Sequence, residues 1–200
     1  MPVRVFTVQE REELRIKMLD AGYALIKEHG MTHASVEKIT QAAGLGKSTF
    51  YNFFSGKEQF VLELIAYQRD CMRSYFDELL AGREKITVAE AKAYFKRVIF
   101  STDSLYQYLT AADEEKLMAY SRKEGTAKEW EDKATQTMTA LLSHMEHVRK
   151  DVDLKTAVNL IRIMAFARMH RDELYAEAME KTLESIYTLF FGIVFEENTF

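Results

Sequence analysis

Five polar side chains lie close together in this sequence, and their types suit hydrogen bonding to DNA bases. They follow the run Gly44-Leu-Gly46 and are Lys47, Ser48, Thr49, Tyr51 and Asn52. Hydroxyl, amide and cationic groups at the start of a helix are those that contact base edges in the major groove. The pattern indicates a DNA-reading surface, and the polar face of an ordinary three-helix core is the alternative at this point.

A helix-turn-helix is predicted to position these side chains. Ser35 is a typical N-cap and begins a short helix that runs to Ala43. Gly44 ends that helix and makes the tight turn, and a second short helix is finished by Phe54. The inward positions of the motif are apolar, and they are Val36, Ile39, Ala43, Leu45, Phe50 and Phe54.

A longer helix is expected on each side of this motif. Before it, apolar residues recur at steps of four, three and four between about residues 10 and 28, as one helix face requires; they are Leu14, Met18, Ala21 and Leu25. After it, Ser55 and Glu58 have the spacing of a capping box, which predicts a helix that runs to about Leu80. Lys57 lies in the first turn of that helix, where backbone N–H groups can also face a phosphate.

The composition predicts an all-α chain. The one proline is Pro2 and there are only eight glycines in 200 residues, so long helices are allowed and turn signals for a β-sandwich are missing. Further helices are expected over about 88–102, 104–123, 127–147, 153–170 and 176–196. The prediction is about nine helices, divided between an N-terminal part at 1–55 that holds the helix-turn-helix and a larger part at 56–200.

The charge is unevenly distributed. The net charge is −4, but residues 1–60 carry eight Lys and Arg against seven Asp and Glu, and the remainder carries 19 against 24. This asymmetry is modest, and it has the sign expected of a DNA-reading head on an acidic body.

Several other classes of protein are not indicated. Cys71 is the only cysteine, which excludes an internal disulfide and fits a reducing compartment, and it is expected to be inert core. There is no leader pattern and no apolar run long enough to span a bilayer, so a cytoplasmic protein without membrane contact is expected. No phosphate loop, nucleophile elbow or metalloprotease motif is present, and His144 and His147 lack a third ligand. We therefore expect no enzyme activity, no cofactor and no metal.

The chain resembles the tetracycline-repressor (TetR) family of bacterial regulators over residues 18–26, Gly30 and 35–60. The block AAGLGKSTFY at 42–51, followed by Phe54 and Lys57-Glu58, is similar to the signature of that family almost position by position. The resemblance implies that residues 1–55 are a DNA-binding head and that residues 56–200 are an effector-binding and dimerisation domain. It also implies a cytoplasmic homodimer that binds a near-palindromic operator and is released from it by a small-molecule effector. A helical small-molecule-binding or interaction protein that does not read DNA is the alternative.

The resemblance also implies roles for single residues. Four positions fall where the family contacts bases or nearby backbone, and three match its phosphate contacts; together they are Ser35, Lys47, Ser48, Thr49, Tyr51, Asn52 and Lys57. Three residues depart from the family pattern. Gly46 replaces a usual capping serine, Phe53 replaces a histidine or tyrosine, and Glu37 places an acid near a base-reading position.

Two further sites are expected in the body. The last helix has an apolar seam at steps of four and three, which favours a dimer interface over a simple core helix once the family is considered; it contains Met179, Leu183, Ile186, Phe190 and Ile193. Large aromatic and methionine side chains in the middle of the chain suit an apolar ligand pocket, although a helical core uses the same types. The candidates are Phe95, Tyr106, Tyr120, Trp130 and Met164.

Overall fold

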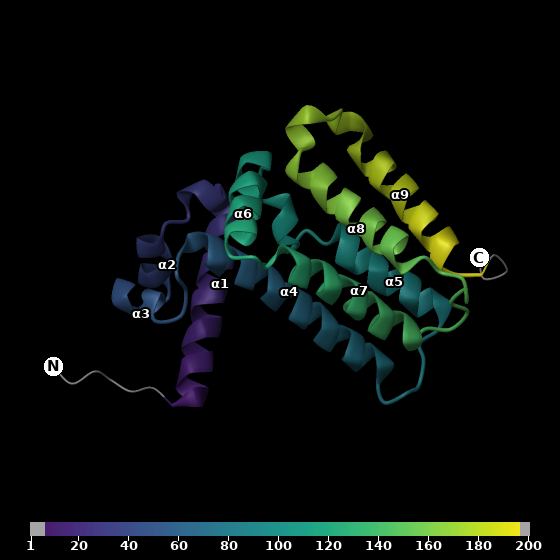
Figure 1. Cartoon of the computed structure of the whole chain (residues 1–200), viewed down its shortest axis with the longest axis horizontal. Helices are drawn as coiled ribbons and strands as arrows, with labels where there is room; N and C mark the ends of the chain where they lie inside the picture. Colours follow the sequence, from purple (N-terminus) through teal and green to yellow (C-terminus); the bar gives the residue numbers. More distant parts are fainter. Residues whose placement is uncertain (1–6, 197–200) are drawn as a thin grey trace.

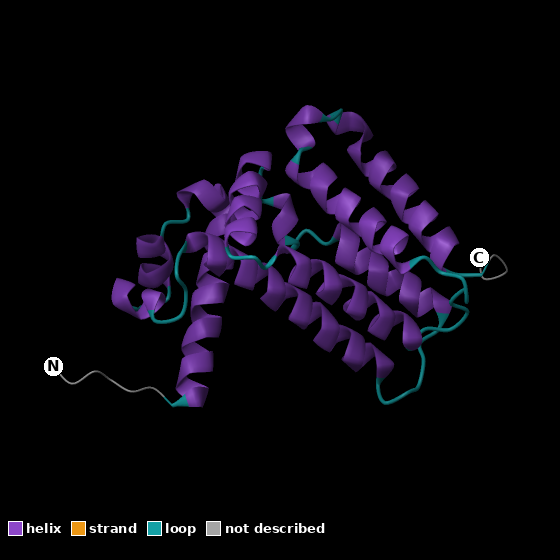
Figure 2. Ribbon diagram, in the orientation of Figure 1, coloured by secondary structure: helices purple, strands orange, loops and turns teal. Residues whose placement is uncertain are grey.

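The computed structural model describes residues 7–196, without the side chains of Ala127 and of residues 129–131. In this range the chain is all-helical (Figures 1 and 2), which confirms the predicted fold class. The α-helices are α1 Val8–His33, α2 Val36–Ala42, α3 Lys47–Tyr51, α4 Lys57–Leu80, α5 Val88–Phe100, α6 Ala111–Lys123, α7 Ala127–Ser143, α8 Leu154–Met169 and α9 Met179–Val194. Three 3-10 turns accompany them, η1 Leu105–Gln107, η2 Arg171–Glu173 and η3 Ala176–Ala178. None of the described helices is long and apolar enough to cross a membrane.

Helices α1, α2 and α3 form a small head at one end of the molecule, and α4 runs from this head into the body (Figure 1). Ser35 caps α2 as predicted, because its Oγ accepts a hydrogen bond from the Lys38 N–H at 3.3 Å. Gly44 makes the turn with φ +65°, a conformation that glycine adopts without steric cost. The cap fixes where α2 begins, and the Gly44 turn fixes the direction in which α3 follows it.

The expected capping box at the start of α4 is not formed. Gly56 is the N-cap and contributes no side-chain hydrogen bond. The Ser55 hydroxyl instead lies 3.0 Å from the Tyr120 hydroxyl of α6, and the Ser55 N–H donates to the side chain of Gln59 at 2.6 Å. The linker between head and body is therefore held by a contact across the fold, which a local sequence pattern does not contain.

The core of the head continues beyond residue 55. Phe50, Phe54 and Phe60 are fully buried, and their ring centroids lie 5.0 to 5.4 Å apart. The same apolar cluster takes in Leu105 of η1 and Leu117 of α6. The head thus rests on α4, η1 and α6 rather than being joined to the body by a flexible linker.

The body is built from α5 to α9 around the second half of α4, and it corrects the expected dimer seam. Leu183 and Phe190 are fully buried inside the chain, and the Phe190 ring packs on Phe95 with centroids 4.9 Å apart. Neither is available to a partner subunit. The other members of that seam are half-buried and pack against the same core; they are Met179, Ile186 and Ile193.

Candidate DNA-reading surface and ligand cavity

Helix α3 presents the predicted polar residues at the tip of the head (Figure 1). Phe50 anchors the helix in the core, and this turns the opposite side outward. The exposed residues on that side are Lys47, Ser48, Tyr51 and Asn52, while Thr49 is half-buried. The structure therefore brings the candidate DNA contacts of this helix to one accessible surface.

Glu37 of α2 forms an ion pair with Lys47, the first residue of α3. A hydrogen bond from Lys47 lowers the pKa of Glu37, and the same bond raises the pKa of Lys47. Both side chains are exposed, so the pair is screened by solvent and can rearrange. Glu37, the acid that departs from the family pattern, is therefore paired with Lys47, the cation that was expected to contact a base.

Lys57 is used inside the head. Its Nζ donates to the carbonyl oxygen of Met31 at 2.9 Å and to that of Thr32 at 3.5 Å. These carbonyls lie at the end of α1, just after the break at Gly30. Because an ammonium group has three N–H donors, one remains for the phosphate contact that the sequence predicted.

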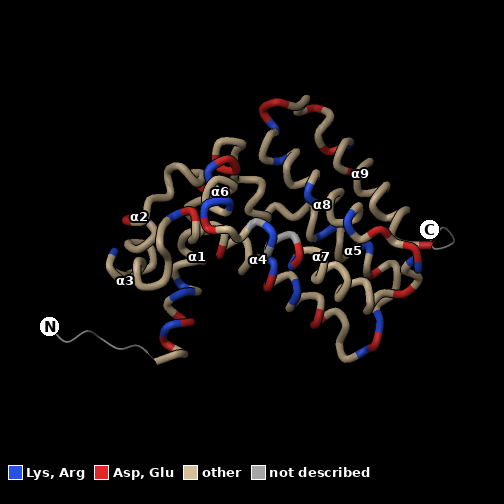
Figure 3. The backbone as a smooth tube through the Cα atoms, in the orientation of Figure 1, with Lys and Arg blue, Asp and Glu red and all other residues tan. Residues whose placement is uncertain are grey.

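Arg11 is a basic residue of this surface that sequence reasoning missed. Its guanidinium lies over the Phe53 ring at 4.8 Å and donates to the carbonyl oxygen of Asn52 at 3.3 Å. Phe53, the second departure from the family pattern, is thus a platform for a cation beside the end of α3. Basic and acidic residues alternate along α1 (Figure 3), so the charge pattern alone did not single out Arg11.

The body contains a cavity of about 590 Å³. Its walls come from α4, α5, α7, α8 and the segment around η1, with Asp20 and Tyr23 of α1 at one side. Two of the predicted ligand residues, Phe95 and Tyr106, line it. Tyr120 and Met164 do not: Tyr120 contacts Ser55, and Met164 is buried in the core of the body. The side chain of Trp130 lies outside the described residues.

Cys71 also lines this cavity and is exposed, which corrects the expectation that it is inert core. It lies on α4, on the same wall as Met72. Because it is the one cysteine in the sequence, its reactivity toward a thiol reagent gives a direct readout of whether the cavity is occupied.

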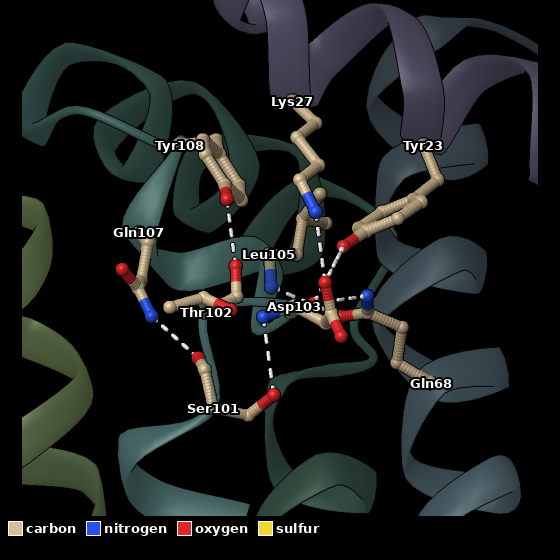
Figure 4. Close-up of polar contacts among 9 residues, drawn as sticks. All are labelled: Tyr23, Lys27, Gln68, Ser101, Thr102, Asp103, Leu105, Gln107 and Tyr108. Atoms are coloured by element: carbon tan, nitrogen blue, oxygen red, sulfur yellow. Dashed lines mark hydrogen bonds and ion pairs between the residues drawn. The ribbon is translucent and has the colours of Figure 1, made fainter.

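Polar contacts hold the segment between α5 and η1 to α1 of the head and to α4 (Figure 4). From α1, Tyr23 donates to the carbonyl oxygen of Asp103 at 3.0 Å, and Lys27 Nζ donates to its Oδ1 at 2.8 Å. From α4, Gln68 donates to the same carbonyl at 2.9 Å and accepts from the Leu105 N–H at 3.0 Å. Three of these residues, Tyr23, Gln68 and Asp103, also line the cavity.

Among the described residues, no group of three or more histidine, cysteine or acidic side chains is placed to hold a metal ion. His144 instead lies with Nδ1 2.9 Å from the carbonyl oxygen of Glu84. His170 lies between two carboxylates, with Nε2 2.7 Å from Glu114 of α6 and Nδ1 2.9 Å from Glu173 of η2. These hydrogen bonds, the one to Glu114 first, raise the pKa of His170 above its usual 6.5.

We expect His170 to make stability depend on pH. Its pKa is raised on folding, so its contribution is fully present below the unfolded value near 6.5 and is lost as the pH rises through the folded value. Urea unfolding of the wild type and of His170→Gln, followed from pH 6 to pH 9, measures this. The wild type is expected to have the larger free energy of unfolding at the acidic end, and the difference is expected to shrink toward the alkaline end. A difference independent of pH would contradict the assignment.

Comparison with known proteins extends these observations. Residues 18–64 match the family model of bacterial regulatory proteins of the tetR family. None of the curated protein sequences matches the chain.

Solved structures resemble the chain over nearly all of its length. A protein assigned to the TetR family from Syntrophomonas wolfei has 19% identity and a TM-score of 0.57, covering 90% of this chain and 93% of its own. A TetR transcriptional regulator from Chloroflexus aurantiacus has 23% identity and a TM-score of 0.52, with 94% and 99% covered. SmeT, the repressor of a multidrug efflux pump of Stenotrophomonas maltophilia, has 16% identity and a TM-score of 0.53, with 93% and 92% covered. At these identities the likeness establishes the shared fold.

Proposed function

We propose that this chain, whose residues 18–64 match the family model of bacterial regulatory proteins of the tetR family, is a cytoplasmic transcription repressor released from its operator by a small molecule. The observation that carries the proposal is the polar face of α3, held outward by Phe50 and by the Gly44 turn. No feature of the described residues favours the alternative of a helical protein that does not bind DNA.

The homodimer of this proposal uses the solvent side of α8 and α9, which lie side by side (Figure 1). Large apolar side chains are exposed there: Ile163 at 47%, Phe166 at 37% and Leu189 at 55%. Gly192 lies on α9 three residues after Leu189, and a Cβ added to it would meet nothing within 4 Å. An exposed apolar face on two adjacent helices suits a four-helix interface between two copies of the chain.

Two heads related by the two-fold axis of such a dimer would read mirrored half-sites, so the operator is expected to be near-palindromic. The effector occupies the cavity of the body. SmeT, which shares the fold, has been solved in complex with triclosan. In the present chain, the cavity wall includes the residues that fix α1 to the segment around Asp103, which gives an occupant a route to the head.

The DNA-binding proposal is tested by in vitro selection from randomised duplexes, followed by titration of the selected sequence. Asn52→Ala is expected to relax sequence preference, because an amide can make paired hydrogen bonds to an adenine edge. Tyr51→Phe is expected to weaken binding to all duplexes by about two- to tenfold, the value of one phosphate hydrogen bond. Tyr175→Phe is the matched control, because Tyr175 is 80% exposed but lies in the turn between α8 and α9. Recovery of no preferred sequence would contradict the proposal and favour the alternative.

The ion pair between Glu37 and Lys47 leads to a second prediction, which concerns the affinity for DNA and its dependence on salt. Glu37→Gln removes a negative charge next to α3 and releases Lys47, so affinity for all duplexes is expected to rise and to fall more steeply with salt. The slope of log K against log salt is expected to change by about 1.8 for the dimer, because each of the two heads adds one phosphate contact worth about 0.9. Glu177→Gln makes the same change in net charge on η3, far from the head, and is expected to leave the slope unaltered. An unchanged slope in Glu37→Gln would show that Lys47 remains unavailable to phosphate.

A further inference from the structure

Arg11 brings a positive charge from α1 to the end of α3. Its side chain is exposed, and two contacts hold it in place. The guanidinium carbon lies 4.8 Å from the centroid of the Phe53 ring, and one N–H group donates to the carbonyl oxygen of Asn52 at 3.3 Å. Asn52 is the C-cap of α3, and its own side chain is exposed on the DNA-reading surface. Arg11 therefore lies directly beside that surface, although it belongs to another helix.

The Phe53 ring below this guanidinium is itself fixed to the core of the head. The Phe53 backbone N–H donates to the carbonyl oxygen of Phe50 at 2.9 Å, which extends the last turn of α3. The Phe53 ring packs beside the fully buried Phe54, with centroids 6.2 Å apart. A cation over an aromatic ring is attracted by the negative charge of the ring face. The core of the head thus sets the position of Arg11 relative to α3.

The charge of Arg11 is not neutralised by a neighbouring acid. On α1, Glu10 closes the capping box of the helix, and Glu12 is paired with Arg15 at 2.8 Å. Within residues 7–196, no carboxylate forms an ion pair with Arg11. A guanidinium group has five N–H donors, and the Asn52 carbonyl takes one of them. The other donors of Arg11 are available to an anion that approaches the head.

We infer that Arg11 binds a phosphate of the DNA backbone at the edge of the groove that α3 enters, and that Phe53 positions Arg11 for this contact. The major groove is about 12 Å wide and is bordered by the phosphates of both strands, so a cation beside the end of a reading helix meets the backbone. A guanidinium group can stack on a ring and still donate two parallel hydrogen bonds to a phosphate. The inference rests on the proposed DNA binding and adds two residues to it.

The phosphate contact is tested with Arg11→Met on the duplex selected by the wild type. The slope of log K against log salt is expected to become shallower by about 1.8 for the dimer, because each of two heads loses one phosphate contact worth about 0.9. Arg11→Lys keeps the cation and is expected to retain most of the slope. Arg97→Met is the matched control, since Arg97 is also exposed and lies over a ring, that of Tyr75 at 4.3 Å, but on α5 of the body. It is expected to leave the slope unaltered.

The positioning role is tested with Phe53→Leu, which keeps the charge of Arg11 and removes the ring below it. The slope is expected to stay near that of the wild type. Affinity is expected to fall by about two- to tenfold for each head, because Arg11 must then be ordered when DNA binds. In the Arg11→Met background the same change at Phe53 is expected to cost less than about twofold, since it acts through Arg11.

The possible results separate the two roles from each other and from the proposed function. An unchanged slope in Arg11→Met, or an equal change in Arg97→Met, would overturn the phosphate contact. An equal loss of affinity from Phe53→Leu in both backgrounds would overturn the positioning role and show that the ring only stabilises the head. Failure of the wild type to select any duplex would refute the proposed function, and this inference with it.

Discussion

Phe166→Glu combined with Leu189→Glu is expected to convert the protein from a dimer into a monomer and to abolish tight operator binding. Both side chains are exposed on the face shared by α8 and α9. A symmetric interface would bury two new carboxylates from each subunit without partners, at a cost of several kcal/mol. A monomer presents one head only, so it loses the second half-site.

The mass in solution is measured by light scattering at micromolar concentration. Val8→Glu, which adds a charge to an 87% exposed apolar residue of α1, is the control and is expected to remain a dimer. Leu183→Glu is expected to behave differently from both, because Leu183 is fully buried within the chain. It should lower the free energy of unfolding by several kcal/mol rather than dissociate a folded dimer. A wild-type mass of one chain would refute the proposed interface.

The helix-turn-helix of α2 and α3 could be predicted from the sequence, because local rules decide its structure. Ser35 caps a helix and Gly44 adopts a positive φ whatever lies elsewhere in the chain. The apolar spacing also placed Phe50 and Phe54 inward, and this fixes which side of α3 faces outward. These are short-range preferences, and the fold of the head satisfies them.

The seam of α9 shows where periodicity was insufficient. Steps of four and three identify one apolar stripe, and such a stripe packs equally well on a partner or on its own core. Here Leu183 and Phe190 belong to the core, together with Tyr187 and Val194. The exposed apolar residue of α9, Leu189, lies outside the stripe. Which surface a stripe covers depends on the packing of α8 and α5, and that information is not local.

Contacts between distant residues were likewise beyond prediction. Arg11 reaches Asn52 across 41 positions and Phe53 across 42, and Lys57 reaches the carbonyl oxygen of Met31 across 26. The family resemblance implied that Lys57 binds a DNA phosphate. In the structure, its ammonium group already donates hydrogen bonds to carbonyl oxygens at the end of α1. A side chain that carries several donors can serve both purposes, and only the three-dimensional arrangement shows which partner is already present.

The joint between head and body leads to the prediction with the most direct bearing on regulation. Asp103→Asn combined with Tyr23→Phe is expected to give a protein that binds operator and cavity ligand but no longer couples them. In the wild type, the Asp103 segment is held by Lys27 and Tyr23 of α1 and by Gln68 of α4. An occupant of the cavity that shifts this segment must also shift α1, and α4, about 36 Å long at 1.5 Å per residue, transmits any tilt to the head.

Coupling is measured by titrating a ligand that slows Cys71 alkylation against the protein, with and without its operator. In the wild type, ligand and operator are expected to weaken each other's binding by the same factor, about one to two orders of magnitude, because coupling is reciprocal. In the double variant this factor is expected to fall below about threefold, with the affinity for operator in the absence of ligand little changed. Lys27 and Asp103 are largely exposed, so loss of their ion pair should not unfold the head.

Asp151→Asn removes a comparable exposed ion pair, with Arg149, at the opposite end of the body and should leave the coupling intact. Retention of full coupling by the double variant would show that the ligand reaches the head through α4 or α6 alone.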